Sequence, residues 1–209
     1  MEDLSKVVER LRRNGFEVLL AENAARAGEI IREKLALQQP EVVSFGDSMS
    51  LYATGVIDWL RNQTEYRLID TFEKGVRFRE LIERRRQAIL CDTFLTGVNA
   101  ISTSDGSLHW LDMIGNRIVP VAFGPKHVIL VAGVNKLVET QEDAYARIRN
   151  IAAPQNVARH EGMKTPCAVT GRCHDCSSPD RICNERLILH KCHPKERITM
   201  ILVEENLGL

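Results

Sequence analysis

Four cysteines near the carboxyl end of the chain form the strongest candidate site in the sequence. They are spaced as Cys167-x5-Cys173-x2-Cys176-x6-Cys183. Four thiolates can bind one zinc ion or hold a [4Fe–4S] cluster, and the inner Cys-x-x-Cys lets two sulfurs reach one centre. The spacing matches neither the two-pair zinc pattern nor the bacterial ferredoxin pattern. It therefore predicts a metal centre without deciding between zinc and iron–sulfur, and free thiols or a disulfide are the alternative interpretation.

The segment around these cysteines, residues 163–195, contains few side chains fit to pack a core. We therefore expect metal binding to offset the chain entropy of this segment and to order it.

A second candidate site is a loop that offers hydrogen-bond donors to an anion. Gly46, Asp47, Ser48 and Ser50 lie between a strand predicted over residues 41–45 and a helical stretch that follows. Backbone N–H groups and hydroxyls at a helix N-terminus suit an anion. The plainer interpretation is that Ser48 only caps the helix and Gly46 only permits a tight turn. The chain has neither G-x-G-x-x-G nor a Walker lysine, so a dinucleotide site or a P-loop is unsupported.

The block from Thr96 to Lys136 concentrates polar residues and turn glycines around predicted strands, which is where sites form in α/β proteins. We expect its cations to surround the same sheet edge as the loop over residues 46–50, called here the serine loop. The candidate ligand-binding residues of this block are Asn99, Asn116, Arg117, Lys126, Asn135 and Lys136. No nucleophile is assigned, because neither Cys91 nor His109 has a partner visible in the sequence. The run Arg84–Arg86 is interpreted as the solvated end of a helix.

Alternating helices and strands must position these residues. Helices are predicted over residues 2–13, 23–37, 75–86 and 141–159, the last interrupted at Pro154, and a further helical stretch follows the turn at residues 46–48 and runs through residue 60. Strands are predicted over residues 16–21, 41–45, 66–70, 88–91, 97–102, 107–111, 128–134 and 197–203, with a hairpin turn at 104–106. This order predicts a single domain over residues 1–209 with a three-layer α/β/α fold and a mostly parallel sheet. The cysteine-rich segment would be an insertion at the edge of that sheet.

Composition excludes several classes of protein. The chain has 209 residues, with 28 basic and 28 acidic side chains, so its net charge is zero. Without clustered Lys and Arg, general nucleic-acid binding is not expected. The longest apolar run, residues 128–134, is far shorter than the roughly 20 residues of a membrane span. The acidic first residues lack a basic leader and an apolar signal core, so we expect a cytoplasmic protein.

Several motifs together resemble the LUD (lactate-utilisation) domain family, which includes the LutC-like proteins. The resemblance covers roughly residues 5–205 of the chain. The matching pieces are residues 46–51 with Gly55 and Leu60, residues 96–101 with Asp105 and Gly106, residues 123–128, residues 133–136, residues 147–149, and Ala153, Pro154 and Asn156.

The resemblance implies a fold similar to the NagB, RpiA and CoA-transferase group, with a small anionic metabolite bound near residues 46–50. It also implies a part in oxidising L-lactate to pyruvate, alongside iron–sulfur subunits that carry electrons. One departure is Asn99, because the family usually has an acidic residue near this position. The alternative function is a non-catalytic binding or assembly protein with a structural zinc, and metal identity distinguishes the two.

Overall fold

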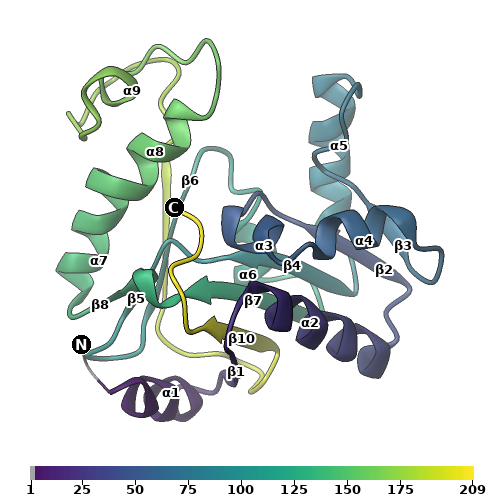
Figure 1. The fold of residues 1–209 in the computed structure, drawn as a ribbon. Coiled ribbons are helices and arrows are strands. Elements are labelled where there is room, and N and C mark those ends of the chain that lie inside the picture. Colours follow the sequence, from purple (N-terminus) through teal and green to yellow (C-terminus); the bar gives the residue numbers. More distant parts are fainter. Residues whose placement is uncertain (1–2) are drawn as a thin grey trace.

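Six parallel strands form the central sheet (Figure 1). The structure is a computed structural model that describes residues 3–209, so residue 2 of the first predicted helix and the first two residues of the acidic N-terminus lie outside it. The strands are β1 (Glu17–Ala21), β2 (Val42–Phe45), β3 (Arg67–Ile69), β4 (Thr93–Gly97), β7 (His127–Gly133) and β10 (Ile198–Val203). Their order is β1-β10-β7-β4-β2-β3, and every neighbouring pair is parallel. The prediction of a mostly parallel sheet is confirmed.

The side chains of β7 show why this strand is central. Val128, Leu130 and Ala132 join one core cluster, whereas Ile129 and Val131 join the other. A strand covered on both faces needs such an uninterrupted apolar run.

Helices cover one face of the sheet, and helices together with a smaller sheet cover the other. The first face is packed by α2 (Ala24–Gln38), α3 (Met49–Ala53) and α4 (Val56–Asn62). The second face is packed by α1 (Leu4–Arg13), α5 (Phe78–Ala88) and α6 (Ile118–Ala122), each through at least one buried side chain. The α/β class with helices on both faces is confirmed, although the second layer also contains strands.

The smaller sheet has the order β8-β5-β6-β9 and begins with the predicted hairpin. Its strands are β5 (Ala100–Ser102), β6 (Leu108–Asp112), β8 (Leu137–Val138) and β9 (Glu185–Leu189). β5 and β6 are antiparallel, and Gly106 in the turn has φ +72°, a conformation that favours glycine. The buried Trp110 of β6 donates from Nε1 to the carbonyl oxygen of Gly97, 2.7 Å away, and so joins the two sheets.

Two predicted strands differ from the structure. Residues 88–91 form the end of α5 and the turn after it, so the predicted strand is wrong there. The predicted strand over residues 97–102 is divided between the end of β4 and β5, which belong to different sheets.

The helical run over residues 141–158 is continuous past Pro154. It consists of α7 (Gln141–Arg147), a π-helical turn (Ile148–Ala152) and α8 (Ala153–Ala158). Proline has no N–H to donate, and the wider π turn before it absorbs that loss as a bulge. The predicted interruption is therefore a local change of helix type.

The cysteine-rich segment is tied to the smaller sheet. It contains α9 (Pro166–Thr170) and β9, and β9 pairs antiparallel with β6 from Leu108 to Asp112. A separate insertion at the edge of the main sheet is therefore not what this segment forms. Among residues 3–209, no helix is long and apolar enough to cross a membrane.

Candidate functional site

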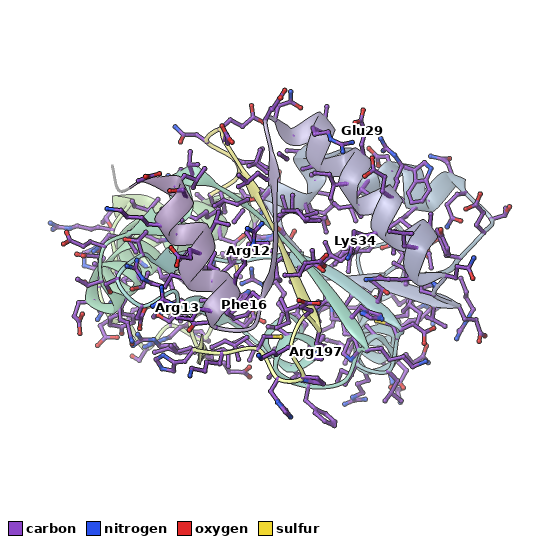
Figure 2. The ribbon with its side chains drawn as sticks, turned by 90° about the horizontal axis from the view of Figure 1, so that it is seen from below. Arg12, Arg13, Phe16, Glu29, Lys34 and Arg197 are labelled. Atoms are coloured by element: carbon purple, nitrogen blue, oxygen red, sulfur yellow. The ribbon has the colours of Figure 1, made fainter. Side chains whose placement is uncertain are left out.

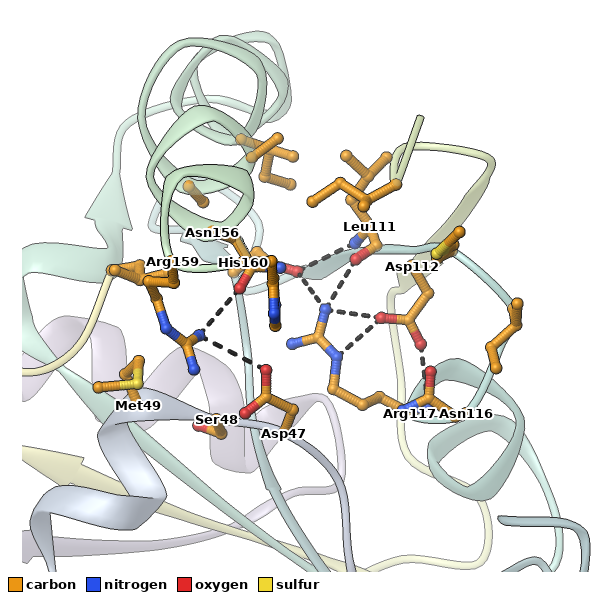
Figure 3. A pocket seen from close by; sticks show the side chains of 18 of the residues that line it. Asp47, Ser48, Met49, Leu111, Asp112, Asn116, Arg117, Asn156, Arg159 and His160 are labelled. Atoms are coloured by element: carbon orange, nitrogen blue, oxygen red, sulfur yellow. Dashed lines mark hydrogen bonds and ion pairs between the residues drawn. The ribbon is translucent and has the colours of Figure 1, made fainter. Parts of the chain in front are cut away.

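A cavity of about 340 Å³ lies beyond the carboxyl ends of the central strands (Figure 3). The loops after β2, β4 and β7 bring Asp47, Asn99 and Lys136 to its wall. The run from α7 to α8 forms another wall and α5 stands across from it (Figure 1). Ligands of α/β proteins bind at this end of the sheet.

Arg85 is a cationic residue of this cavity that the sequence interpretation missed. Its neighbours on α5 make surface ion pairs, Arg84 with Glu73 and Glu80, and Arg86 with Glu83. Arg85 instead lines the cavity, with its guanidinium carbon 4.8 Å from the ring centroid of Phe72. Its Nε is buried without a hydrogen-bond partner among the described residues. Burial lowers the pKa of Arg85, against the opposing charge of Asp47.

Arg117 lies across the serine loop but is neutralised by a carboxylate of its own (Figure 3). Its Nε donates to Asp112 Oδ1 at 2.7 Å, and its Nη2 donates to the carbonyl oxygen of Leu111 at 2.7 Å. Asp112 is only 4% exposed and also accepts from the backbone N–H groups of Arg117 and Ile118. The third guanidinium nitrogen, Nη1, faces the cavity on the side of Asp47 and His160 (Figure 3). Arg117 is therefore chiefly a structural cation, contrary to the expected role as a free anion ligand.

Asp47 joins two walls of the cavity. Its carboxylate lies 3.5 Å from Nη1 of Arg159, and the same nitrogen donates to Asn156 Oδ1 at 2.9 Å (Figure 3). This contact connects the loop after β2 with the end of α8. The carboxylate has no other hydrogen-bond partner among the described residues.

The serine loop owes its shape to packing. Ser48 lines the cavity, and its Oγ accepts from the backbone N–H of Leu51, so it caps α3 as the plainer interpretation holds. α3 has only five residues, which is too short to build a strong helix dipole. A Cβ on Gly46 would lie 2.6 Å from Cγ of Arg117, so glycine is needed for close packing rather than for a ligand. Ser50 is buried, does not line the cavity, and donates to the carbonyl oxygen of Leu207 at 2.9 Å.

Asn135 and Lys136 hold the last residues of the sequence. Asn135 Oδ1 accepts from the backbone N–H of Leu207 at 3.0 Å. Lys136 Nζ and Arg147 Nη2 both donate to the main-chain oxygen of Leu209. Burial, followed by the charges of Arg147 and Arg117, lowers the pKa of Lys136 to about 7. Lys136 lines the cavity and Asn135 does not.

Lys126 is at the opposite end of the sheet, so its predicted place in the site is wrong. It precedes β7 and pairs with Asp92, which precedes β4, at 2.7 Å. This end of the molecule, seen in Figure 2, also carries Lys34 and Arg197. Residues before parallel strands must lie at the amino edge, whereas the cavity is at the carboxyl edge.

The structure thus brings together six of the ten predicted ligand-binding residues. They are Asp47, Ser48, Asn99, Asn116, Arg117 and Lys136, and those outside the cavity lining are Gly46, Ser50, Lys126 and Asn135. The cavity also has apolar walls, among them Phe72, Ile148 and Met163. A cationic group without a protein counter-ion beside apolar walls suits a small organic anion.

The four predicted metal ligands do not form a centre in residues 3–209. In this part of the chain no three His, Cys, Asp or Glu side chains are grouped so that they could hold a metal ion. Cys173 Sγ accepts from Arg149 Nε at 3.2 Å, whereas Cys167 Sγ lies 3.2 Å from the hydroxyl of Thr165. Cys176 and Cys183 are half-buried free thiols. The four thiols are therefore not gathered around one centre in the described residues, and metal binding by them stays a prediction.

Comparisons with known proteins show a family match over most of the chain and a solved structure of similar fold. The sequence model of the LUD domain matches residues 4–203. A solved structure, that of a DUF162 family protein from Deinococcus radiodurans, superimposes with a TM-score of 0.53 and 15% sequence identity, covering 96% of this chain and 94% of that one. At this identity the likeness shows the fold alone. None of the curated proteins matches the chain.

Proposed function

The chain belongs to the LUD domain family, and we propose that its cavity binds a small organic anion as a component of organic-acid oxidation. The observation that carries the proposal is Arg85, a cation turned into the cavity without an acidic partner in residues 3–209. The expected ligands are L-lactate and its oxidation product pyruvate, as the resemblance implies. Iron–sulfur subunits are the expected electron partners, and no described residue is assigned to the oxidation itself.

Placing a guanidinium in a partly buried site costs free energy, which a hydrogen-bonded anion recovers. Arg84 and Arg86 satisfy their charges with glutamates, so α5 has acids available on its other faces. Asp47 lines the same cavity and its charge acts on Arg85, but no acidic side chain of residues 3–209 lies within 4.0 Å of this guanidinium, and a ligand carboxylate or phosphate would supply that contact.

The predicted zinc or [4Fe–4S] centre at Cys167, Cys173, Cys176 and Cys183 stays a prediction. It is separate from the anion site, because Arg85 and the cavity need no metal to bind a carboxylate.

Two neighbouring arginines allow a matched test of the anion site. Isothermal titration calorimetry at low ionic strength compares L-lactate, pyruvate and inorganic phosphate on the wild type, Arg85→Gln and Arg86→Gln. Both changes remove one positive charge from α5, but only Arg85 faces the cavity. Since a charged hydrogen bond contributes about 1.5–3 kcal/mol, Arg85→Gln should weaken binding roughly 10- to 150-fold. Arg86→Gln should leave it within about twofold, because its charge is exposed and screened.

The two variants also separate binding from folding. Arg85→Gln removes a desolvated charge and a cation–π contact, two effects of opposite sign, so the free energy of unfolding should change by less than about 1 kcal/mol. The proposal fails if none of the three anions binds the wild type, or if both variants weaken binding equally.

A further inference from the structure

Residues 204–209, which follow β10, form a strap that runs between α3 and α7 to the cavity (Figure 1). Its first part is well anchored. The backbone N–H of Val134 donates to the carbonyl oxygen of Glu205 at 3.1 Å, and Leu207 is buried in the core. Beyond Leu207 the hold is weaker, because Gly208 is exposed and its carbonyl oxygen accepts only from Asn135 Nδ2, at 3.4 Å, among the described residues.

The strap ends on a pair of buried cations. Lys136 Nζ and Arg147 Nη2 both donate to the main-chain oxygen of Leu209, the second at 3.0 Å. Lys136 is 4% exposed and Arg147 is 7% exposed. The other donors of Arg147 reach the carbonyl oxygens of Asn99 at 2.7 Å and Asn135 at 3.0 Å. In residues 3–209 no acidic side chain lies within 4.0 Å of either cation.

Two cationic donors that converge on one oxygen form a binding site for a carboxylate. A carboxylate offers two oxygens and a full charge, and hydrogen bonds from charged donors to such a group are among the strongest in proteins. Leu209 and Lys136 both line the cavity, so a ligand there can reach the position of the Leu209 oxygen without a new opening. The strap thus covers a cation pair that a bound acid can use.

Gly208 supplies the hinge that such an exchange needs. Its φ is +69°, a conformation that favours glycine. A Cβ at this position would lie 2.7 Å from the backbone nitrogen of Ser50, so the strap passes α3 at a distance that only glycine permits. Rotation at Gly208 moves Leu209 away from the cations while Leu207 stays in the core.

We propose that Lys136 and Arg147 form a second anion subsite of the cavity, that the strap fills it, and that the carboxylate of an organic acid binds there by displacing Gly208 and Leu209. Arg147 belongs to α7 and Lys136 to the loop after β7, so this subsite is separate from Arg85 on α5. The inference rests on the proposed function, because the acid is the ligand expected in the cavity. It adds an autoinhibitory contact that the acid must break.

A substitution at Gly208 tests the strap without changing either cation. Gly208→Ala places a methyl group against the backbone of Ser50, so residues 208 and 209 must shift. Gly171→Ala is the matched control, because Gly171 has the same φ of +69° but nothing within 4 Å of the added Cβ. Circular dichroism checks that both variants are folded.

Isothermal titration calorimetry then compares pyruvate and acetate on the wild type and the two variants. Gly208→Ala should bind both acids roughly tenfold more tightly than the wild type, because the acid no longer has to break the two hydrogen bonds to Leu209. Gly171→Ala should stay within about twofold of the wild type. In a Lys136→Met background, Gly208→Ala should give no gain, because the cation that the strap covers is gone.

Nuclear magnetic resonance shows the displacement directly in the wild type. On addition of pyruvate, the ¹⁵N heteronuclear Overhauser effect of the Gly208 and Leu209 amides should fall as the end of the strap becomes mobile. That of Leu207 should not change, because its N–H stays bonded to Asn135.

The failures of the two proposals are distinguishable. Acids that bind through Arg85 with equal affinity for the wild type and Gly208→Ala, and leave the Leu209 amide ordered, overturn the strap and leave the anion site standing. A gain in Gly208→Ala that persists with Lys136→Met overturns the cation subsite. Absence of binding to both the wild type and Gly208→Ala contradicts the anion site and this inference together.

Discussion

Replacing Arg117 by glutamine tests whether this cation is structural. Asp112 is 4% exposed, and the Arg117 side chain beside it is 13% exposed. Removing one partner of such a pair leaves a buried charge that neither water nor another side chain neutralises. Arg117→Gln should therefore destabilise the fold rather than act on ligand binding alone.

The hydrogen bonds that Asp112 retains in Arg117→Gln determine how much stability is lost. Its carboxylate still accepts from two backbone N–H groups, those of residue 117 at 2.8 Å and Ile118 at 3.1 Å. Breaking a buried pair costs about 3–5 kcal/mol, and these remaining donors place the loss at the low end, about 3 kcal/mol. For a chain of this size that corresponds to a fall in Tm of roughly 6–12 °C.

Urea denaturation followed by circular dichroism measures the loss, and a double-mutant cycle assigns it to the pair. Arg117→Gln and Asp112→Asn each leave one charge unpaired, whereas the double variant leaves none. The double variant should therefore lose less than the sum of the single losses, by about 1–3 kcal/mol. Losses of the two single variants that simply add in the double variant would contradict this pairing. If Arg117→Gln is as stable as the wild type but no longer binds anions, Arg117 is a ligand-binding residue.

Two further predictions concern acid stability and the cysteines. Burial, with the charge of Arg186 as the next cause, lowers the pKa of His109 from 6.5 to about 4. The unfolded chain therefore takes up the proton first, and stability present above pH 6.5 should fall by about 3 kcal/mol toward pH 4. Urea unfolding at several pH values should show this fall in the free energy of unfolding in the wild type and in the exposed control His174→Gln, but not in His109→Asn. The same pH dependence in His109→Asn would contradict the role of His109. Anaerobic purification with metal analysis tests the predicted cysteine centre: bound zinc or iron lost in Cys176→Ser would confirm it, and metal-free protein with four freely titrating thiols would contradict it.

The sequence by itself determined the elements whose pattern is local. The apolar run over residues 128–134 predicts a strand buried on both faces, and β7 is that strand. The first helix and the hairpin around Gly106 follow from periodicity and turn chemistry, which act over a few residues. The position of the cavity at the end of the sheet where Asp47 and Asn99 lie follows from the directions of the parallel strands. The same strand directions predict that Lys126, which precedes a strand, lies at the opposite edge of the sheet.

Only the tertiary structure decided which charged and polar side chains face the cavity. Arg84, Arg85 and Arg86 have the same side chain, and the packing of α5 alone turns the middle one inward, away from the glutamates that pair with its neighbours. Ser50 and Asn135 looked like ligand residues, but contacts with residues more than seventy positions away bind them to the end of the sequence. Such partners depend on how distant segments meet, because hydrogen bonds and ion pairs act over a few ångströms in space and not along the chain.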